Sequence, residues 1–229
     1  MGRDGVLRQL IVLTARQALG RRRVLVALLA ACVPVLVAVI YRLAGGQDAQ
    51  AWTSNLLDNV VITTLLPLVA LIFGTSVLGG EIEDGTIVYL LVRPVARWQI
   101  VLAKLAVGAV ATAVVVGASA AIAGVTWGAL IYVAIAVALS LVTGHALIIG
   151  LVYVYIWEGV VAGLFTGTRL LSVHQYVLGV MSTLDPSQPS MLPAHLPISS
   201  SVELGAVVAV GAAVVAAWRL SRFEVSERP

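Results

Sequence analysis

The strongest constraint on the fold of this chain is a series of long apolar runs separated by short polar stretches. Of its 229 residues, 60% are apolar and 11% are charged, whereas soluble domains carry about 25% charged residues. Such a chain lacks the polar side chains needed to cover its surface in water. Apolar runs of roughly 20 residues cross the hydrocarbon core of a bilayer as helices. The sequence therefore predicts an all-α membrane protein.

Six of these runs predict six transmembrane helices. The predicted spans are Val24–Tyr41, Leu56–Leu78, Ile100–Gly124, Gly128–Val142, Ala146–Phe165 and Val202–Trp218. Only Val125–Trp127 separate the third span from the fourth. The fourth holds roughly 15 residues, fewer than a span usually requires. It is therefore tilted or partial, or a native segment is absent there, and five crossings are the alternative.

The basic residues are distributed unequally over the connections of this topology. Twelve precede the first span, join the second to the third or follow the last, namely Arg3, Arg8, Arg16, Arg21, Arg22, Arg23, Arg93, Arg97, Lys104, Arg219, Arg222 and Arg228. Only Arg42 and Arg169 fall on the other side. Because cytoplasmic loops are enriched in Lys and Arg, the sequence predicts a multi-pass protein of the plasma membrane with both termini in the cytoplasm.

The two ends of the chain lie outside the predicted six-span domain, which covers residues 24–219. Residues 1–23 mix Leu10, Ile11 and Leu13 with Arg8 and Arg16. This mixture favours an amphipathic helix in the cytoplasmic membrane interface, with a frayed tail as the alternative. Residues 220–229 are predicted to be a cytoplasmic tail.

A charged segment interrupts the apolar sequence between the second and third spans. Gly79 and Gly80 are expected to end the second span, and Pro94 to stop the element that follows. Acidic residues precede Thr86–Val92, and arginines follow it. Because a helix dipole favours negative charge at its N-terminus and positive charge at its C-terminus, residues 81–94 are predicted to form a short cytoplasmic helix. An ordinary solvated loop is the alternative.

This segment follows the pattern E-x-E-x-G-T-I-x-x-L-L-x-R-P-V-x-R-W-x-I-x-x-A-K, which resembles the signature of type-2 ABC exporter permeases. The matching residues are Glu81, Glu83, Gly85, Thr86, Leu90, Leu91, Arg93, Pro94, Arg97 and Lys104. The resemblance extends over nearly the whole chain and departs in the shortened region between the third and fourth spans.

The resemblance implies that residues 81–94 form a coupling helix, which docks in a groove of a cytoplasmic ATPase subunit. The coupling residues that it implies are Glu81, Glu83, Gly85, Thr86, Arg93, Pro94 and Arg97. Arg93 and Arg97 are expected to pair with an acidic rim on that partner.

The sequence offers no ATP site of its own. A phosphate-binding loop requires G-x-x-x-x-G-K-[S/T], but the only lysine, Lys104, follows Leu102-Ala103 and precedes Leu105. The chain is therefore predicted not to be an enzyme and to hold no cofactor, with ATP and Mg²⁺ bound by the partner subunit. Two ATPase copies need two coupling loops, so a second permease copy or a related permease is expected. The remaining expected partner is membrane lipid, with no nucleic acid.

Glu158 is the most unusual residue inside a predicted span. A carboxylate at this depth is costly and is a functional candidate by default. Together with Tyr155 and Trp157, it is expected to face the translocation path or the seam of a dimer. The alternative, equally weighted, is a structural carboxyl group that is hydrogen-bonded to a neighbouring span.

Three further patterns bear on packing and on the sites that the sequence lacks. Small residues at every fourth position from Gly159 and from Gly205 predict close helix packing, within the subunit or across a dimer. Residues 166–201 are predicted to form an outer-leaflet segment before the last span, with a plain extracellular loop as the alternative. The spacing of His145, His174 and His195 fits no metal site.

The leading hypothesis is thus a permease subunit of an ATP-driven ABC exporter, which forms the translocation path and couples to a separate ATPase. A non-transporting membrane scaffold or immunity protein of the same superfamily is the first alternative. A membrane-embedded enzyme is the second, and it is disfavoured because only Glu158 supplies a polar group of the necessary kind within the spans.

Overall fold

A computed structural model describes residues 21–43, 57–83, 96–116, 122–161, 170–184 and 196–222, and every regular element within these ranges is helical. The elements are α2 (Arg21–Leu43), η1 (Leu57–Leu65), α4 (Leu66–Glu83), α6 (Arg97–Val116), α7 (Ile122–Val142), α8 (Ala146–Val152), η2 (Tyr153–Val161), α10 (Val173–Leu184) and α11 (Ile198–Ser221). The two π-helices prolong their neighbours, since η1 runs directly into α4 and α8 runs directly into η2.

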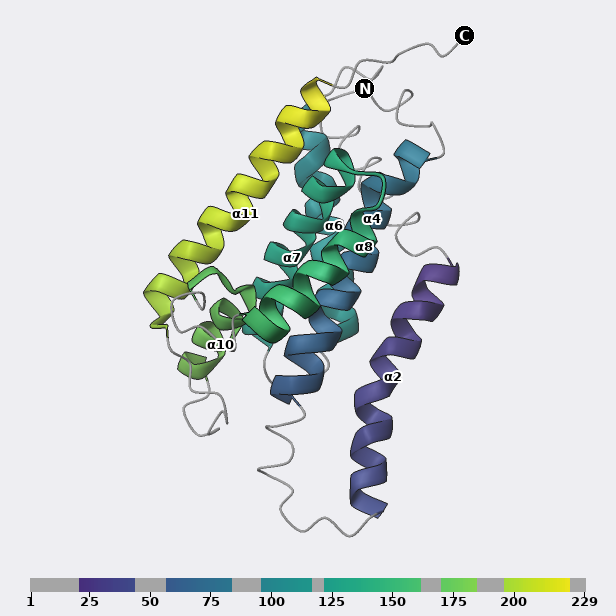
Figure 1. Ribbon diagram of the computed structural model, residues 1–229, viewed down its shortest axis with the longest axis vertical. Helices are drawn as coiled ribbons and strands as arrows, with labels where there is room; N and C mark the ends of the chain where they lie inside the picture. The colour runs from purple at the N-terminus through teal and green to yellow at the C-terminus, as the bar shows by residue number, and fades with distance from the viewer. Residues whose placement is uncertain are drawn as a thin grey trace, which may run out of the picture.

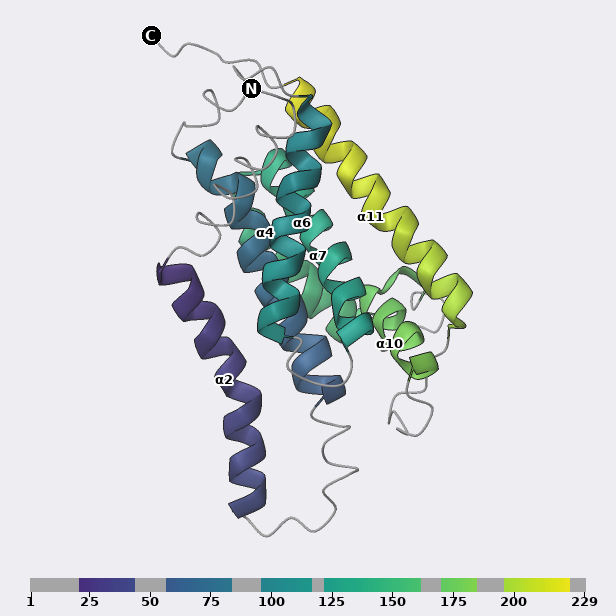
Figure 2. The same cartoon turned by 180° about the vertical axis from the view of Figure 1, so that it is seen from behind.

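Helix α7 is the centre of the bundle. It packs against α4, α6, α10 and α11 (Figures 1 and 2). Small residues bring these helices close together: a Cβ at Gly74 would lie 2.5 Å from the Cβ of Ala136, and a Cβ at Gly108 would lie 2.8 Å from Cγ1 of Val133. Close packing of this kind is the main source of helix association in lipid.

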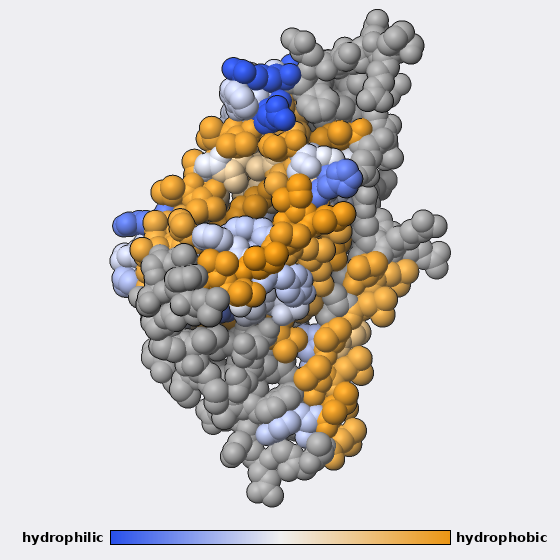
Figure 3. Space-filling view, in the orientation of Figure 1, coloured by the Kyte–Doolittle hydropathy of each residue, from blue (hydrophilic) through white to orange (hydrophobic). Residues whose placement is uncertain are grey.

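Helix α2 lies at the side of the bundle, where it contacts α4, α6 and η1 only sparsely (Figure 2). Leu29, Leu36 and Leu43 are strongly exposed, at 69%, 59% and 82%. Figure 3 shows hydrophobic surface along α2 and across the bundle, with hydrophilic residues gathered at the end where α11 finishes. Lipid is the solvent that such a surface requires.

Among the described residues, four helical segments are long and apolar enough to cross a membrane: Val60–Gly79, Arg97–Val116, Gly124–Val142 and Ile198–Ser221. Two shorter apolar helices are Cys32–Tyr41 and Ala146–Val161. The chain is therefore an all-helical, multi-pass membrane protein, and the predicted count of six spans is not confirmed.

The predicted boundaries of the third and fourth spans are wrong. Helix α6 ends at Val116 rather than Gly124, and α7 begins at Ile122 rather than Gly128. The residues taken for the connection are part of α7, where Val125 is only 1% exposed. Residues 117–121 read G-A-S-A-A, and such small residues do not interrupt a hydropathy profile. The candidate span that corresponds to the predicted fourth one, Gly124–Val142, has 19 residues, which is close to the length that a membrane helix requires.

The glycines that were expected to end the second span do not end the helix, because α4 continues through Gly79 and Gly80 to Glu83. The candidate span itself ends at Gly79, close to the predicted end at Leu78. A Cβ at Gly79 would lie 3.6 Å from the Cβ of Ser140. The glycine therefore belongs to the face of α4 that approaches α7, and it does not terminate the helix.

The small-residue stripe of α11 packs within the subunit. A Cβ at Gly205 would lie 2.7 Å from Nε1 of Trp127 and 2.8 Å from Cδ1 of Ile131, and Ala209 is buried. The stripe that begins at Gly159 shows no such close packing at that residue. A Cβ at Gly159 would meet only the carbonyl oxygen of Val154, at 3.9 Å.

Several predicted segments fall partly or wholly outside the described residues. These include residues 1–20 of the interfacial helix, residues 84–95 of the coupling segment, and most of the C-terminal tail. Within the predicted outer-leaflet segment, residues 166–201, the structure contains α10 and the start of α11.

Candidate functional site

A buried ion pair joins the end of α4 to α6. The Nζ of Lys104 lies 2.8 Å from Oε1 of Glu81, and Lys104 is 1% exposed while Glu81 is 12% exposed. Lys104 also donates a hydrogen bond of 2.6 Å to the carbonyl oxygen of Val77. A lysine withdrawn from water requires such compensation, and here it comes from the last turns of α4.

Arg97, the first residue of α6, binds the C-terminal end of α11. Its Nη1 donates to the carbonyl oxygen of Leu220 at 2.7 Å and also to that of Ser221. The last carbonyl groups of a helix have no partner within the helix and carry partial negative charge. The guanidinium group satisfies both needs, so α4, α6 and α11 are tied together at one end of the bundle. We call these contacts of Glu81, Lys104 and Arg97 the basal clamp.

The basal clamp lies on both sides of residues 84–95, which hold Gly85, Thr86, Arg93 and Pro94 and lie outside the described residues. The coupling role of those four residues stays a prediction. The acidic residues were expected at the start of a short helix, but Glu81 and Glu83 lie in the last turn of α4. Gly79, which was expected to end the helix, lies instead on the face of α4 that approaches Ser140 of α7.

The sequence interpretation gave Arg97 a salt bridge on a partner and gave Lys104 no partner at all. The signal for the ion pair was nevertheless present, since a lone lysine in an apolar span requires an anion nearby. Glu81, in the last turn of α4, is the acidic group that lies beside it in the structure.

Glu158 occupies a second buried polar site, where η2 meets α7 and α10. The hydroxyl group of Tyr132, on α7, donates to its Oε2. The main-chain N–H of Val173, the first residue of α10, donates to its Oε1 at 2.8 Å. A carboxylate at this position satisfies an unpaired N–H group and faces the positive end of the helix dipole.

Of the three residues Tyr155, Trp157 and Glu158, which were grouped together from the sequence, Glu158 forms the hydrogen bonds to Tyr132 and α10. Tyr155 is 53% exposed and lies on the outer surface of η2, and Trp157 is half-buried. The structure thus supplies the neighbouring-span contact that was one of the two interpretations. Sequence reasoning did not find Tyr132, because nothing in its own apolar run marks it as a partner.

A second contact holds α10 beside η1. Nε2 of His174 lies 3.1 Å from Oγ1 of Thr63. Helix α10 is not among the candidate spans, and burial lowers the pKa of His174 from its ordinary value of 6.5 to about 4. The imidazole is therefore neutral at pH 7. Together with Glu158 it fixes the start of α10 against three neighbours, namely η2, α7 and η1.

No group of three or more His, Cys, Asp or Glu side chains that could hold a metal ion occurs among the described residues. The hydrogen bonds and the ion pair described for the two sites join their polar groups to helix ends, hydroxyl groups and one another. Their arrangement is suited to holding helices in place.

A family model described as "ABC-2 family transporter protein" matches residues 19–184. Because this match covers well over half of the chain, the protein belongs to the ABC-2 transporter family. The resemblance drawn from the charged segment is thereby confirmed at the level of the family, and the chain is an ABC-2 type permease. No curated protein matches the chain.

Proposed function

We propose that this permease is the membrane subunit of an ATP-driven exporter and couples to a separate ATPase subunit through residues 84–95. The family supports a transporter membrane subunit. The coupling residues are those of the charged segment, namely Glu81, Glu83, Gly85, Thr86, Arg93, Pro94 and Arg97. Both termini and this segment face the cytoplasm of a cell whose plasma membrane holds the protein.

The basal clamp is the observation that carries this proposal. A segment docked on an ATPase transmits movement only if its two ends are fixed to the helices that move. Here one end follows the Glu81–Lys104 pair and the other precedes Arg97, which is bound to α11. Displacement of residues 84–95 would therefore act on α4, α6 and α11 together, since packed helices shift as units.

The complex contains two permease subunits, identical or related, and two ATPase subunits. ATP and Mg²⁺ are bound by the ATPase, and the permease supplies the path. Glu158 and its neighbours Tyr155 and Trp157 lie along that path or at the seam between the two permeases.

Co-expression with an ATPase subunit encoded beside the permease, followed by purification through a tag on the permease, tests this function. The expected results are co-purification and, in nanodiscs, vanadate-sensitive ATP hydrolysis. Reversing the charge of the coupling segment with Arg93→Glu should abolish co-purification. Arg42→Glu, predicted to lie on the opposite side of the membrane, is the matched control.

Each alternative predicts a different result. A scaffold or immunity protein would retain the ATPase without stimulating its hydrolysis. Co-purification that is equally strong with Arg93→Glu and the unmodified chain would exclude the coupling role of residues 84–95.

A further inference from the structure

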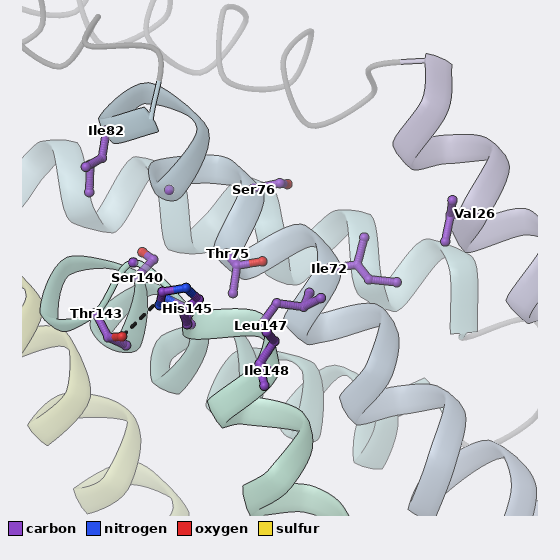
Figure 4. Close-up of a pocket in the computed structure, with 13 residues that line it drawn as sticks. Val26, Ile72, Thr75, Ser76, Ile82, Ser140, Thr143, His145, Leu147 and Ile148 are labelled. Atoms are coloured by element: carbon purple, nitrogen blue, oxygen red, sulfur yellow. Dashed lines mark hydrogen bonds between the residues drawn. The ribbon is translucent and has the colours of Figure 1, made fainter.

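A cavity of about 520 Å³ lies near the basal clamp, between α2, α4 and the turn that joins α7 to α8 (Figure 4). We propose that it binds an amphiphile with an uncharged, hydroxyl-bearing head, either a sugar or a glycerol group. The hydrocarbon chain of this amphiphile extends toward α2. The inference does not depend on an ATPase partner or on transport.

The lining of the cavity is divided into a polar and an apolar part. Figure 4 shows Thr75, Ser140, Thr143 and His145 gathered on one side, with Ile82 at their margin. The apolar side chains on the other side are Val26, Ile72, Leu147 and Ile148. A ligand that fills both parts needs a polar head and an apolar chain.

Two hydroxyl groups of the polar part, those of Thr75 and Ser140, act as hydrogen-bond acceptors. Oγ1 of Thr75 donates its proton to the carbonyl oxygen of Leu71 at 2.6 Å. Oγ of Ser140 donates to the carbonyl oxygen of Val137 at 2.8 Å. Since a hydroxyl group has one proton and two lone pairs, these two oxygens offer only lone pairs to a ligand. The head must therefore donate hydrogen bonds.

Thr143 supplies the complementary group. Its Oγ1 accepts a hydrogen bond of 3.2 Å from the N–H of His145, so its own proton is left for a ligand. A ligand head that both donates and accepts fits these two kinds of group together. Hydroxyl groups do both, whereas an ammonium group only donates and a phosphate mainly accepts.

Among the described residues that line it, the cavity has no charged side chain that would favour a ligand with an ionic head group. The residues that line the cavity, all within the described part of the chain, include no Asp, Glu, Lys or Arg. The C-terminal end of α7 and the N-terminal end of α8 meet at residues 143–145. Their partial charges have opposite signs, so they offset each other.

The depth of the cavity suits a lipid head. The candidate spans of α4 and α7 end at Gly79 and Val142, and both Gly79 and Thr143 border the cavity. The head would thus lie where the hydrocarbon core meets water. The apolar side is bordered by Val26, which is 50% exposed, with Leu29 one turn further along α2 at 69%. A hydrocarbon chain can lie along this side without leaving the membrane.

Photo-crosslinking of the purified chain, alone in phosphatidylcholine nanodiscs, tests the proposal. The probes are a dodecyl glucoside and a monoacylglycerol, each with a diazirine in its hydrocarbon chain. We expect saturable labelling of peptides from α2 and α8. Unlabelled dodecyl glucoside should compete, whereas dodecylphosphocholine and dodecyltrimethylammonium at the same concentration should not. Labelling by only one probe would identify the head as sugar or as glycerol.

Two sets of variants locate the site. Thr75→Val should weaken binding of the glucoside roughly three- to tenfold by removing one acceptor, as should Ser140→Ala. Thr112→Val is the matched control, because it removes the same type of hydroxyl-to-carbonyl bond in α6, to Gly108. Leu147→Trp should block labelling by filling the cavity, while Ile149→Trp, on the exposed surface of the same turn, should not.

The proposal is overturned if labelling is not saturable, if the charged amphiphiles compete as well as the glucoside, or if Thr75→Val and Ser140→Ala bind normally. Because the ATPase is absent from these measurements, a failure here leaves the exporter function untouched. Failure of co-purification with an ATPase, in turn, leaves this site untouched.

Discussion

Two carboxylates, Glu81 and Glu158, are held inside the same bundle by opposite means. Glu81 faces a full positive charge, with 2.8 Å between its Oε1 and Nζ of Lys104. Glu158 faces neutral donors, namely the hydroxyl group of Tyr132 and the main-chain N–H groups of Val173 and His174. Removing one partner of a buried ion pair leaves the other charge unpaired, which is strongly destabilising. Removing one of several neutral donors leaves the carboxyl group with the others, so the loss of stability is smaller.

The two sites also differ in what they restrain. The basal clamp joins α4, α6 and α11 at the residues that flank positions 84–95 in the sequence. Glu158 and His174 fix the start of α10, a helix of 12 residues that is not itself a candidate span. We infer that α4, α6 and α11 form a rigid base beside the proposed coupling segment, residues 84–95. Helix α10, in contrast, is anchored individually through Glu158 and His174. The following predictions test that contrast in order of decreasing effect.

Glu81→Leu is expected to have the largest effect on stability. It leaves Lys104, only 1% exposed, without its anion, and breaking a buried pair in this way costs about 3–5 kcal/mol. The temperature of unfolding in detergent, followed by tryptophan fluorescence, measures the loss. The charge-free double variant Glu81→Leu/Lys104→Met should recover most of it. If the double variant is as unstable as the single one, the site is not an ion pair in the folded protein.

The residues of the basal clamp could be singled out from the sequence, but the contacts between them could not. Glu81, Arg97 and Lys104 all belong to the pattern on which the family resemblance rests. Their pairing was not predicted because it depends on α4 continuing past Gly79, and a glycine pair was interpreted as a helix end. Glycine in a membrane helix also serves close packing, and only the position of Ser140 on α7 shows which use applies.

The limits of the spans were predictable only where polar residues or prolines mark them. Helix α11 starts directly after Pro197, close to the prediction. Residues 117–121, between α6 and α7, are only glycine, alanine and serine, so no charged residue or proline marks a boundary there. Likewise, Glu158 was identified as exceptional because charge is rare in a span. Its partner Tyr132 was not, because a tyrosine in an apolar run is ordinary.

Acid should loosen the α10 site before it affects the basal clamp. The folded protein holds His174 neutral, with its pKa lowered to about 4, whereas the unfolded chain protonates it near 6.5. The unfolded state therefore binds more protons between these values, and stability falls as pH decreases from about 6.5 to 4. The loss is at most about 3 kcal/mol. Unfolding temperatures at several pH values measure it.

His174→Gln is the matched control for this pH dependence. The amide can still bond to Thr63 but has no proton to gain, so its unfolding temperature should vary less over this window. An equal pH dependence in both proteins would assign the effect to other groups.

Tyr132→Phe should have a smaller effect, about 1–2 kcal/mol, because it removes one hydrogen bond to a charged acceptor. Glu158 keeps the bond from Val173. Glu158→Gln should be tolerated to a similar extent, since one amide oxygen can still accept. If Glu158 serves the translocation path, Glu158→Gln lowers transport per folded molecule while Tyr132→Phe does not. Loss of folding with unchanged specific transport would assign Glu158 a structural role alone.

Arg97→Met is expected to have the smallest effect on stability, about 0.3–1 kcal/mol, because it removes a favourable charge from one helix end. The methionine retains much of the apolar stem. Arg222→Met is the matched control: Arg222 lies near the same helix end, but its guanidinium group stacks on Trp218 at 4.2 Å. Unfolding temperature and ATPase stimulation, measured on the same preparations, separate the two possible roles of Arg97.

A role for Arg97 through α11 and a role on the partner subunit predict different patterns in these variants. In the first role, Arg97 acts only by binding the carbonyl oxygens of Leu220 and Ser221. In that case Arg97→Lys, compared with Arg97→Met, should recover both the unfolding temperature and the ATPase stimulation, because an ammonium group also binds a helix end. If it binds a planar carboxylate on the ATPase, Arg97→Lys should restore stability alone, because lysine cannot form the paired hydrogen bonds of a guanidinium group. The second outcome would show that the rigid base and the coupling contact are separate functions of one residue.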